Sequence, residues 1–256
     1  ERALDPDTIA LLERVGVRPG MRCLEVGPGL GSIARWMAER VGPTGRVLGL
    51  DINARFAQQI VGDRSNITFR VGDIATEAGE ADEFDIVHAR LVIGHVRDKD
   101  AALRNILRCT RSAGQVLIED VDFLWTDVGT QPVYPERHQA VYSEVWASAV
   151  RYMEQNGFEV HFGRRLAGLL RTTGFERVGG RVTMHVGDPD VTRAMRFTVA
   201  RFGPALLNSG SVSAAALRAF DDLMASPDII FTGSPTFSIW ATKPTLSATN
   251  SPLGRA

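Results

Sequence analysis

The sequence predicts a doubly wound α/β fold, in which helices cover both faces of a sheet of mostly parallel strands. Five short apolar runs, each bounded by turn residues, alternate with stretches that repeat apolar residues at helical spacing. A glycine-rich turn follows the first of these runs directly. Since a strand, a helix and another strand in this order need a crossover connection, we expect parallel strands and right-handed crossovers.

The first half of the chain contains these five strands. We expect them at residues 22–26, 46–51, 67–71, 84–89 and 115–120. Before them, residues 4–17 have a helical pattern, and a second helix over residues 31–41 ends at the Pro and Gly of "VGPTG". A third helix, over residues 98–110, begins at Asp98, a residue type favoured at helix N-termini, and ends near the "SAG" turn.

The pattern changes after residue 120. Residues 121–160 are rich in aromatic side chains and helical in their middle, and residues 189–232 form a second helical insertion. Further elements are a helix over 164–175, a strand-like run over 176–186 and a last strand over 236–244. Both insertions leave the carboxyl ends of strands, where open α/β sheets bind ligands. We therefore expect one domain over residues 1–256, with the two insertions forming a substrate cap.

Composition argues against several classes of protein. The 29 lysines and arginines are balanced by 30 acidic residues, so the formal charge of −1 provides no attraction to nucleic acid or to an anionic membrane. Cys23 and Cys109 lie outside any disulfide or zinc spacing, and we expect no metal site. No apolar stretch is long enough to span a membrane and no signal-peptide pattern opens the chain, which predicts a cytoplasmic protein.

The stretch "CLEVGPGLGS", residues 23–32, places Gly27, Gly29 and Gly31 directly after the first strand. A glycine-rich turn between a strand and a helix lets a small molecule lie against the main chain and the amide groups of the helix N-terminus. Asp51 ends the second strand 20 residues beyond Gly31, where a carboxylate can accept hydrogen bonds from a ribose diol. Taken alone, the glycines also fit a tight turn, and Asp51 fits a helix N-cap.

Four segments in this order resemble the class I S-adenosylmethionine-dependent methyltransferases, particularly the bacterial small-molecule members of natural-product type. They are "LEVGPGLGSIARWMAERV", "VLGLDIN", "FRVGDI" and "FDIVHARLVIGHVRDKDAALRNILRCTRSAGQVLIED". The resemblance extends from about residue 6 to Pro244. It implies a Rossmann-like, three-layer α/β/α fold with a seven-stranded sheet whose last strand is antiparallel, and residues 236–244 suit that strand.

The resemblance also implies which residues bind S-adenosylmethionine. The residues matched to its methionine part are Glu25, Gly27, Gly29, Gly31, Ala89 and Arg90. Those matched to its ribose and adenine are Asp51, Ile52, Asp73 and Ile74. These residues also fit purely structural roles. Asp73 fits a turn, and Arg90 fits a solvated cation on the surface. Members of the family often fold residues ahead of the first helix over the cofactor, and because this chain begins with Glu1 we expect such a segment to be missing.

Methyl transfer to an oxygen or nitrogen atom releases a proton, which calls for a general base. His95, in the loop after the fourth strand, lies where related small-molecule enzymes place a histidine near the acceptor, and His138 is the second candidate. A structural role, bonded to a neighbouring loop, is the alternative for His95. The remaining histidines are expected in strands or at strand edges without an evident partner: His88, His161 and His185.

Aromatic side chains of the two insertions predict an apolar pocket for the methyl acceptor. They are Trp125, Tyr134, Tyr142, Trp146, Phe197 and Phe202, and the alternative for each is packing in the interior. We expect a small, flat, aromatic or polycyclic acceptor that is methylated on an O, N or C atom. No nucleic-acid or membrane partner is expected, and a homodimer stays open.

Two other functions stay open. An NAD(P)-dependent oxidoreductase shares the glycine-rich turn, although no Tyr-x-x-x-Lys pair of a dehydrogenase follows it. A protein that binds S-adenosylmethionine without transferring its methyl group, as a cyclisation catalyst or a regulator, fits the same motifs.

Overall fold

The structure of the protein, a computed structural model, describes residues 3–53, 55, 62, 64–77, 79–123, 136–227 and 229–245, with the backbone alone for residues 136–138. Its strands are β1 (Arg22–Val26), β2 (Arg46–Asp51), β3 (Ile67–Val71), β4 (Phe84–Arg90), β5 (Thr110–Val121), β6 (Glu176–Thr183) and β7 (Thr236–Thr242). Its helices are α1 (Asp5–Val15), α2 (Ser32–Val41), the short 3₁₀ helix η2 (Ile93–His95), α4 (Lys99–Cys109), α5 (Glu136–Gln155), α6 (Phe162–Thr173), α7 (Pro189–Asn208) and α8 (Ala214–Ala225).

The strands form a seven-stranded sheet in the order β3-β2-β1-β4-β5-β7-β6. Strands β1 to β5 pair in parallel, whereas β7 is antiparallel to both of its neighbours, β5 and β6. This topology confirms the expected doubly wound fold with an antiparallel last strand. The order of the strands reverses between β1 and β4, which is where open α/β sheets bind their ligands.

The largest difference from the predicted boundaries lies at the start of the fifth strand. Strand β5 begins at Thr110, so the segment expected as a turn before it is an irregular part of the strand itself. Its register against β4 shifts between Phe84 and Ile86, and Ala113 has a φ of 59°. Helix α4 still begins where expected, because the Asp98 side chain accepts a hydrogen bond from the Ala101 amide.

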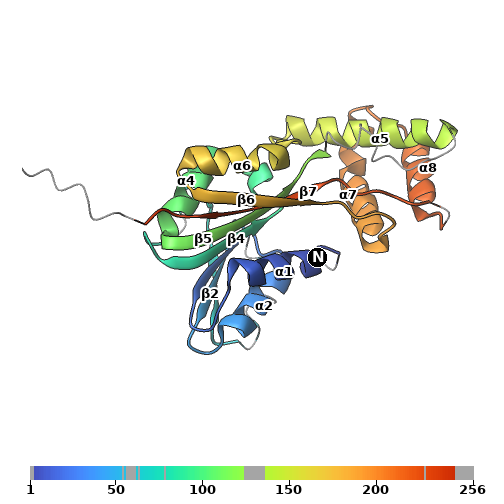
Figure 1. The fold of residues 1–256 in the computed structure, drawn as a ribbon. Coiled ribbons are helices and arrows are strands. Elements are labelled where there is room, and N and C mark those ends of the chain that lie inside the picture. Colours follow the sequence, from blue (N-terminus) through green and yellow to red (C-terminus); the bar gives the residue numbers. More distant parts are fainter. Residues whose placement is uncertain are drawn as a thin grey trace, which may run out of the picture.

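Helices cover both faces of the sheet and complete three layers (Figure 1). Helices α1 and α2 pack on one face with a buried cluster that includes Leu12 and Met37. Helices α4 and α6 pack on the other face around Leu103 and Phe162. Apolar residues at helical spacing form these buried stripes, as the sequence patterns predict.

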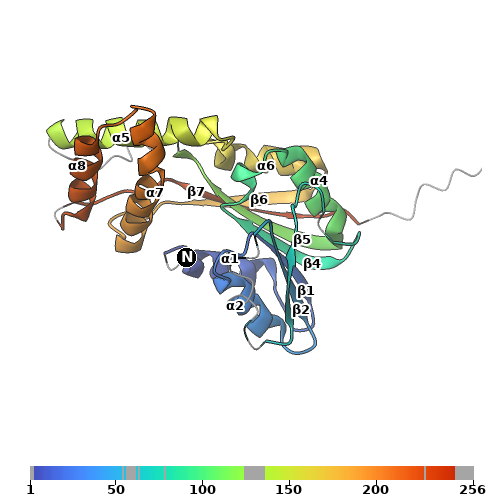
Figure 2. The same ribbon diagram turned by 180° about the vertical axis from the view of Figure 1, so that it is seen from behind.

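Helices α5, α7 and α8 form a separate helical group at one end of the sheet (Figures 1 and 2). They share a third buried cluster, in which Tyr142, Val199 and Phe220 meet. Helix α5 follows β5 in the chain, and α7 and α8 lie between β6 and β7. The helical group therefore follows the carboxyl ends of β5 and β6, and its role as a substrate cap stays a prediction.

Candidate functional site

A pocket of about 320 Å³ opens at the carboxyl edge of the sheet, at the reversal of strand order. Residues that end β1 and β2, or that follow β3 and β4, line it: Val26, Gly27, Gly29, Leu50, Asp51, Ile52, Gly72, Asp73, Ile74, Leu91, Val92, His95, Val96 and Arg97. The parallel strands place these residues together because their carboxyl ends meet at one edge.

The fold itself requires glycine in this turn, in addition to any need of a ligand in the pocket. Gly27 has a φ of 64°, and a Cβ atom on it would lie 2.2 Å from Cγ2 of Val92. The close approach of Val92 therefore excludes a side chain at Gly27 even before a ligand is considered. Gly31 also has a left-handed conformation, with a φ of 80°, at the N-cap of α2. The turn thus aims the N-terminus of α2 at the edge of the sheet.

Asp51 and Asp73 both line the pocket, as predicted, and both also close local turns. The Oδ1 atom of Asp51 accepts a hydrogen bond from the Asn53 amide at 3.0 Å, and Oδ1 of Asp73 accepts one from the Ala75 amide at 2.8 Å. Ile52 lines the same pocket and is 74% exposed, which is unusual for a large apolar side chain. Ile74 also lines this pocket and is buried.

A second pocket of about 250 Å³ adjoins the first, and the two share Gly27, Gly29, Leu91 and Val92. Its other lining residues are Leu4, Glu25, Pro28, Ser32, Ile33 and Arg90. Glu25 and Arg90 therefore lie in the predicted site. Ala89 does not: it is buried in the core and lines neither pocket, because its side chain points into the sheet's packed face.

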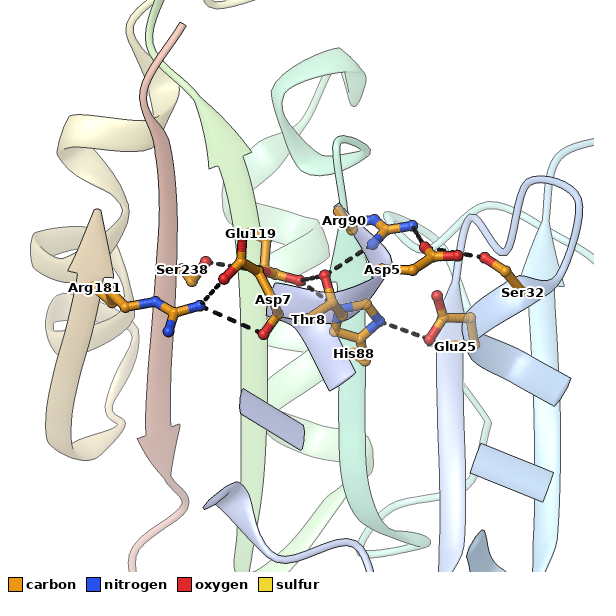
Figure 3. Close-up of polar contacts among 10 residues, drawn as sticks. All are labelled: Asp5, Asp7, Thr8, Glu25, Ser32, His88, Arg90, Glu119, Arg181 and Ser238. Carbon is orange, nitrogen blue, oxygen red and sulfur yellow. Dashed lines mark hydrogen bonds and ion pairs between the residues drawn. The ribbon is translucent and has the colours of Figure 1, made fainter. Parts of the chain in front are cut away.

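Beneath the second pocket, charged and hydroxyl side chains form a buried row across the sheet (Figure 3). His88 on β4 lies between two carboxylates: its Nδ1 atom is 2.7 Å from Glu25 Oε2, and its Nε2 atom is 3.1 Å from Glu119 Oε2. Thr8 of α1 and Ser238 of β7 each donate a hydrogen bond to Glu119 at 2.6 Å. His88 is buried as expected, but the expectation that it has no partner is wrong.

The electrostatics of this row follow from its burial. Burial by itself would lower the pKa of His88, but Glu25 and Glu119 outweigh it and raise that pKa to about 9. Burial would raise the pKa of Glu119, yet the hydrogen bond and charge of His88, with the two hydroxyl donors, hold it below its usual value. At neutral pH the row therefore contains an imidazolium between carboxylates.

Arg90 joins this row to the first helix. Its guanidinium donates to Thr8 Oγ1 at 2.8 Å and to Asp5 Oδ1 at 2.7 Å, and the Arg90 side chain is only 10% exposed. The Ser32 hydroxyl donates to the same oxygen of Asp5 at 3.2 Å. Arg90 is thus a paired, largely buried cation that holds α1 over the site (Figure 3).

The turn after β4 contributes lining residues that sequence reasoning missed. Leu91 adopts a left-handed conformation with a φ of 57°, which is uncommon for a residue with a large side chain. Leu91 and Val92 line both pockets. No sequence signal marks Leu91, because nothing in a leucine predicts a positive φ.

His95 lines the first pocket at the end of η2, as the predicted base should. Its ring centroid lies 4.4 Å from that of Phe158. Partial burial, with the positive charges of Lys99 and Arg201, lowers the pKa of His95 and favours its neutral form. The turn that presents it is held by Asp120, whose Oδ2 atom accepts a hydrogen bond from the Gly94 amide at 2.9 Å.

The other histidines lie away from the two pockets where they are described. The side chain of His138 lies outside the described residues, although its backbone belongs to α5. His161 is the N-cap of α6, not part of a strand, and its Nε2 atom is 3.5 Å from Glu159. His185 follows β6, with Nε2 at 3.4 Å from Asp7.

The predicted acceptor-binding aromatics have different surroundings. Tyr142 is 1% exposed and packs with Phe220 and Phe231, and Trp146 is buried against Phe123. Both side chains therefore pack in the interior of the helical group. Interior packing was the alternative to acceptor binding for these aromatic residues. Phe202 contacts the Tyr152 ring, whereas Phe197 is 69% exposed. Trp125 and Tyr134 lie outside the described residues, and contact of the six with an acceptor stays a prediction.

Two features are absent from the described residues. No group of three or more histidine, cysteine, aspartate or glutamate side chains among them could hold a metal ion. Nor does the described part of the chain contain a helix with the length and apolar character needed to cross a membrane.

Comparison with known proteins identifies the family. Residues 2–178 match a family model described as a methyltransferase domain. Phosphoethanolamine N-methyltransferase 1 of Arabidopsis thaliana is 27% identical over 175 residues, which cover 67% of this chain and 32% of that protein. A ubiquinone/menaquinone biosynthesis C-methyltransferase of Cupriavidus pinatubonensis is 28% identical over 193 residues, 69% of this chain and 78% of that protein.

The fold agrees with this assignment. One similar structure is phosphoethanolamine N-methyltransferase 2 of Haemonchus contortus, solved with phosphomonomethylethanolamine and S-adenosylhomocysteine. The match covers 94% of this chain and 53% of that chain, with a TM-score of 0.59 and 20% identity. The chain spans about a third of the length of the plant relative. Because the family model covers residues 2–178 of 256, the chain belongs to the class I S-adenosylmethionine-dependent methyltransferases.

Proposed function

We propose that the protein transfers the methyl group of S-adenosylmethionine to a small-molecule acceptor by in-line displacement. The observation that supports this most directly is the pair of adjoining pockets at the reversal of strand order, with acidic residues at both ends. Asp51 and Asp73 suit the ribose and adenine of the cofactor, and Glu25 suits its positively charged amino group. Exposed Ile52 offers an apolar surface for one face of the adenine.

The residues of the chain then act mainly by position. S-adenosylmethionine supplies a methyl group that is already activated by the sulfonium. Catalysis therefore depends on holding the acceptor atom in line, within about 3–3.5 Å of the methyl carbon, and on excluding water. His95, neutral at physiological pH and in the wall of the first pocket, accepts the proton of an oxygen or nitrogen acceptor. A carbon or already ionised acceptor needs no such base.

The acceptor we propose is an aromatic or polycyclic small molecule. A series of ring contacts supports it, since His95 touches Phe158, Phe158 touches Phe123, and Phe123 touches Trp146 of the helical group. Of these four rings, that of His95 lines the first pocket, so a flat acceptor bound there would extend the row of rings at His95. Some relatives are named for methylation of nitrogen and others for methylation of carbon. We therefore propose no single acceptor atom, and nitrogen, carbon and oxygen all stay open. A cytoplasmic role in natural-product biosynthesis, without a nucleic-acid partner, remains a prediction from the sequence.

The test compares ligands and then products. S-adenosylhomocysteine should raise the melting temperature of the protein, whereas NADH should not. Incubation with isotopically methyl-labelled S-adenosylmethionine and a panel of metabolites should then produce a labelled acceptor and S-adenosylhomocysteine together. Stabilisation by NADH alone would contradict the cofactor assignment. Stabilisation by S-adenosylhomocysteine, together with an unlabelled product that forms from a panel compound, would instead favour the non-transferring alternative.

A further inference from the structure

The buried row beneath the second pocket contains more charge than the fold requires. Glu25, His88 and Glu119 come from three neighbouring strands, and all three side chains are buried (Figure 3). Buried charges of this kind are costly unless they are paired and hydrogen-bonded. Apolar residues of similar size would fill the same space without this cost, so the arrangement points to a role beyond packing.

The geometry determines the protonation state of His88. Each of its two ring nitrogens lies within hydrogen-bond distance of a carboxylate oxygen, at 2.7 Å from Glu25 and 3.1 Å from Glu119. An ionised carboxylate can only accept hydrogen bonds, so both nitrogens must donate, which only the imidazolium form does. His88 therefore donates to both carboxylates and fixes their orientation.

Glu25 extends this arrangement to the ligand site. It lines the second pocket with Ser32 and Arg90, while its Oε2 atom is bonded to His88. Arg90 is already paired with Asp5 and Thr8, so among the lining side chains Glu25 is the anion available to a cationic group. At its other end the row reaches α1, because Thr8 donates to the Glu119 oxygen that faces His88.

We propose that His88 is a positioning residue for the amino-acid end of S-adenosylmethionine: it orients Glu25, whose carboxylate accepts hydrogen bonds from the α-ammonium group of the cofactor. The inference rests on the proposed function. Through Glu119 and Thr8, the same cation fixes α1, whose N-cap residue Leu4 lines this pocket. His88 itself lines neither pocket, so it acts through Glu25.

The test uses two ligands that differ at this end. S-adenosylhomocysteine carries the amino-acid group, whereas 5′-methylthioadenosine has the same nucleoside without it. In His88→Gln the neutral amide leaves Glu25 without its cationic partner. By calorimetry at pH 7.5, we expect the affinity for S-adenosylhomocysteine to fall about 10- to 100-fold, the effect of a lost charged hydrogen bond, with 5′-methylthioadenosine within about twofold of wild type.

The matched control is Ser238→Ala, which removes a different hydrogen bond of Glu119 and leaves the His88–Glu25 contact in place. Its ratio of the two affinities should equal that of wild type. Equal losses for both ligands in His88→Gln, or no loss, would overturn the proposal. If the wild-type protein binds neither ligand, it is the proposed function that fails.

A measurement on the wild-type protein covers the case in which His88→Gln does not fold. The side-chain ¹⁵N signals of His88, assigned by substituting the other histidines, should show both nitrogens protonated at pH 7.5. They should stay so when S-adenosylhomocysteine is added. A neutral His88 ring in either state would contradict the inference.

Discussion

At the scale of single residues, Asp51 and Asp73 each bond one carboxylate oxygen to a backbone amide two positions later. Such a bond fixes the side chain at the end of its strand, facing the pocket that both line. Each aspartate is therefore a turn residue and a candidate ligand at once, so for Asp73 the two explanations left open by the sequence are compatible.

Substituting Asp51 tests its proposed contact with ribose. Asp51→Ala should weaken binding of S-adenosylmethionine by about 1–3 kcal/mol, the range for a lost hydrogen bond to a charged group. Isothermal calorimetry measures this loss. Asp100→Ala, an exposed carboxylate of α4 that lines neither pocket, is the control and should bind as wild type does. Unchanged affinity in folded Asp51→Ala would remove Asp51 from the site.

His95→Ala tests the proposed base. Turnover should fall ~10²- to 10⁴-fold while cofactor affinity is retained, because a general base acts only in the chemical step. Since the pKa of His95 is lowered, wild-type activity should decline only as the pH falls below the usual histidine value, and this decline should disappear in the variant. Single-turnover methyl transfer across pH is the measurement.

The control for this experiment is His161→Ala, a partly exposed histidine that lines neither pocket. Wild-type rates in His95→Ala at every pH would leave positioning alone as the source of catalysis. In that case the alternative for His95, a structural role, is the better explanation, and its ring contact with Phe158 supports that role.

At the scale of elements, the first helix is attached to the sheet by polar contacts as well as by packing. Asp5 and Thr8 bond to Arg90 of β4, and Asp7 pairs with Arg181 of β6 at 2.8 Å (Figure 3). These contacts join the N-terminal turn of α1 to β4, whose Arg90 lines the second pocket, and to β6 at the edge of the sheet. They thereby fix the start of α1, where Leu4 lines the same pocket.

The glycine turn permits a test at the same scale. An alanine at position 27 would have to adopt a left-handed conformation, and its Cβ atom would clash with Val92. Gly27→Ala should therefore lower the free energy of unfolding by roughly 2–4 kcal/mol. The double variant Gly27→Ala/Val92→Ala should recover the part due to the clash. Gly210→Ala is the matched control, because Gly210 has a φ of 69° and open space around it.

Urea unfolding measures these three variants, and Gly210→Ala should cost only the conformational part, about 1–2 kcal/mol. If Gly27→Ala costs no more than Gly210→Ala, contact with Val92 is not what excludes a side chain from the turn. The need for a close ligand would then be the remaining reason for a glycine there.

At the scale of the whole molecule, the buried row makes folding depend on pH. His88 has a pKa of about 9 in the folded protein and an ordinary value near 6.5 when unfolded. The folded protein therefore binds a proton that the unfolded chain releases between these values. This contribution to stability is fully present below pH 6.5 and is lost as the pH rises through 9.

Chemical unfolding across pH should show this loss, which is on the order of 3 kcal/mol for a shift of this size. His88→Gln should remove most of the slope between pH 6.5 and 9, although it is less stable throughout because two carboxylates stay buried without their cation. The difference between the two curves isolates His88 from other groups. Parallel curves would show that His88 is not the source.

The sequence by itself determined the class of fold, most of the strands and the place of the candidate site. Apolar runs and helical spacing are local properties, and the turn residues between them are local as well. The positions of Gly27, Asp51 and Asp73 at strand ends follow from the same patterns, because parallel strands gather their carboxyl ends at one edge.

Only the tertiary structure decided the contacts that make the site specific. His88 meets Glu25 across 63 residues of chain and Glu119 across 31, and Thr8 reaches Glu119 across 111. The register of strand pairing and the docking of α1 set these distances, and neither has a signal within one segment. For the same reason Tyr142 and Trp146 have the aromatic pattern of a binding wall but lie in the interior of the helical group, since burial depends on which other helices pack against α5.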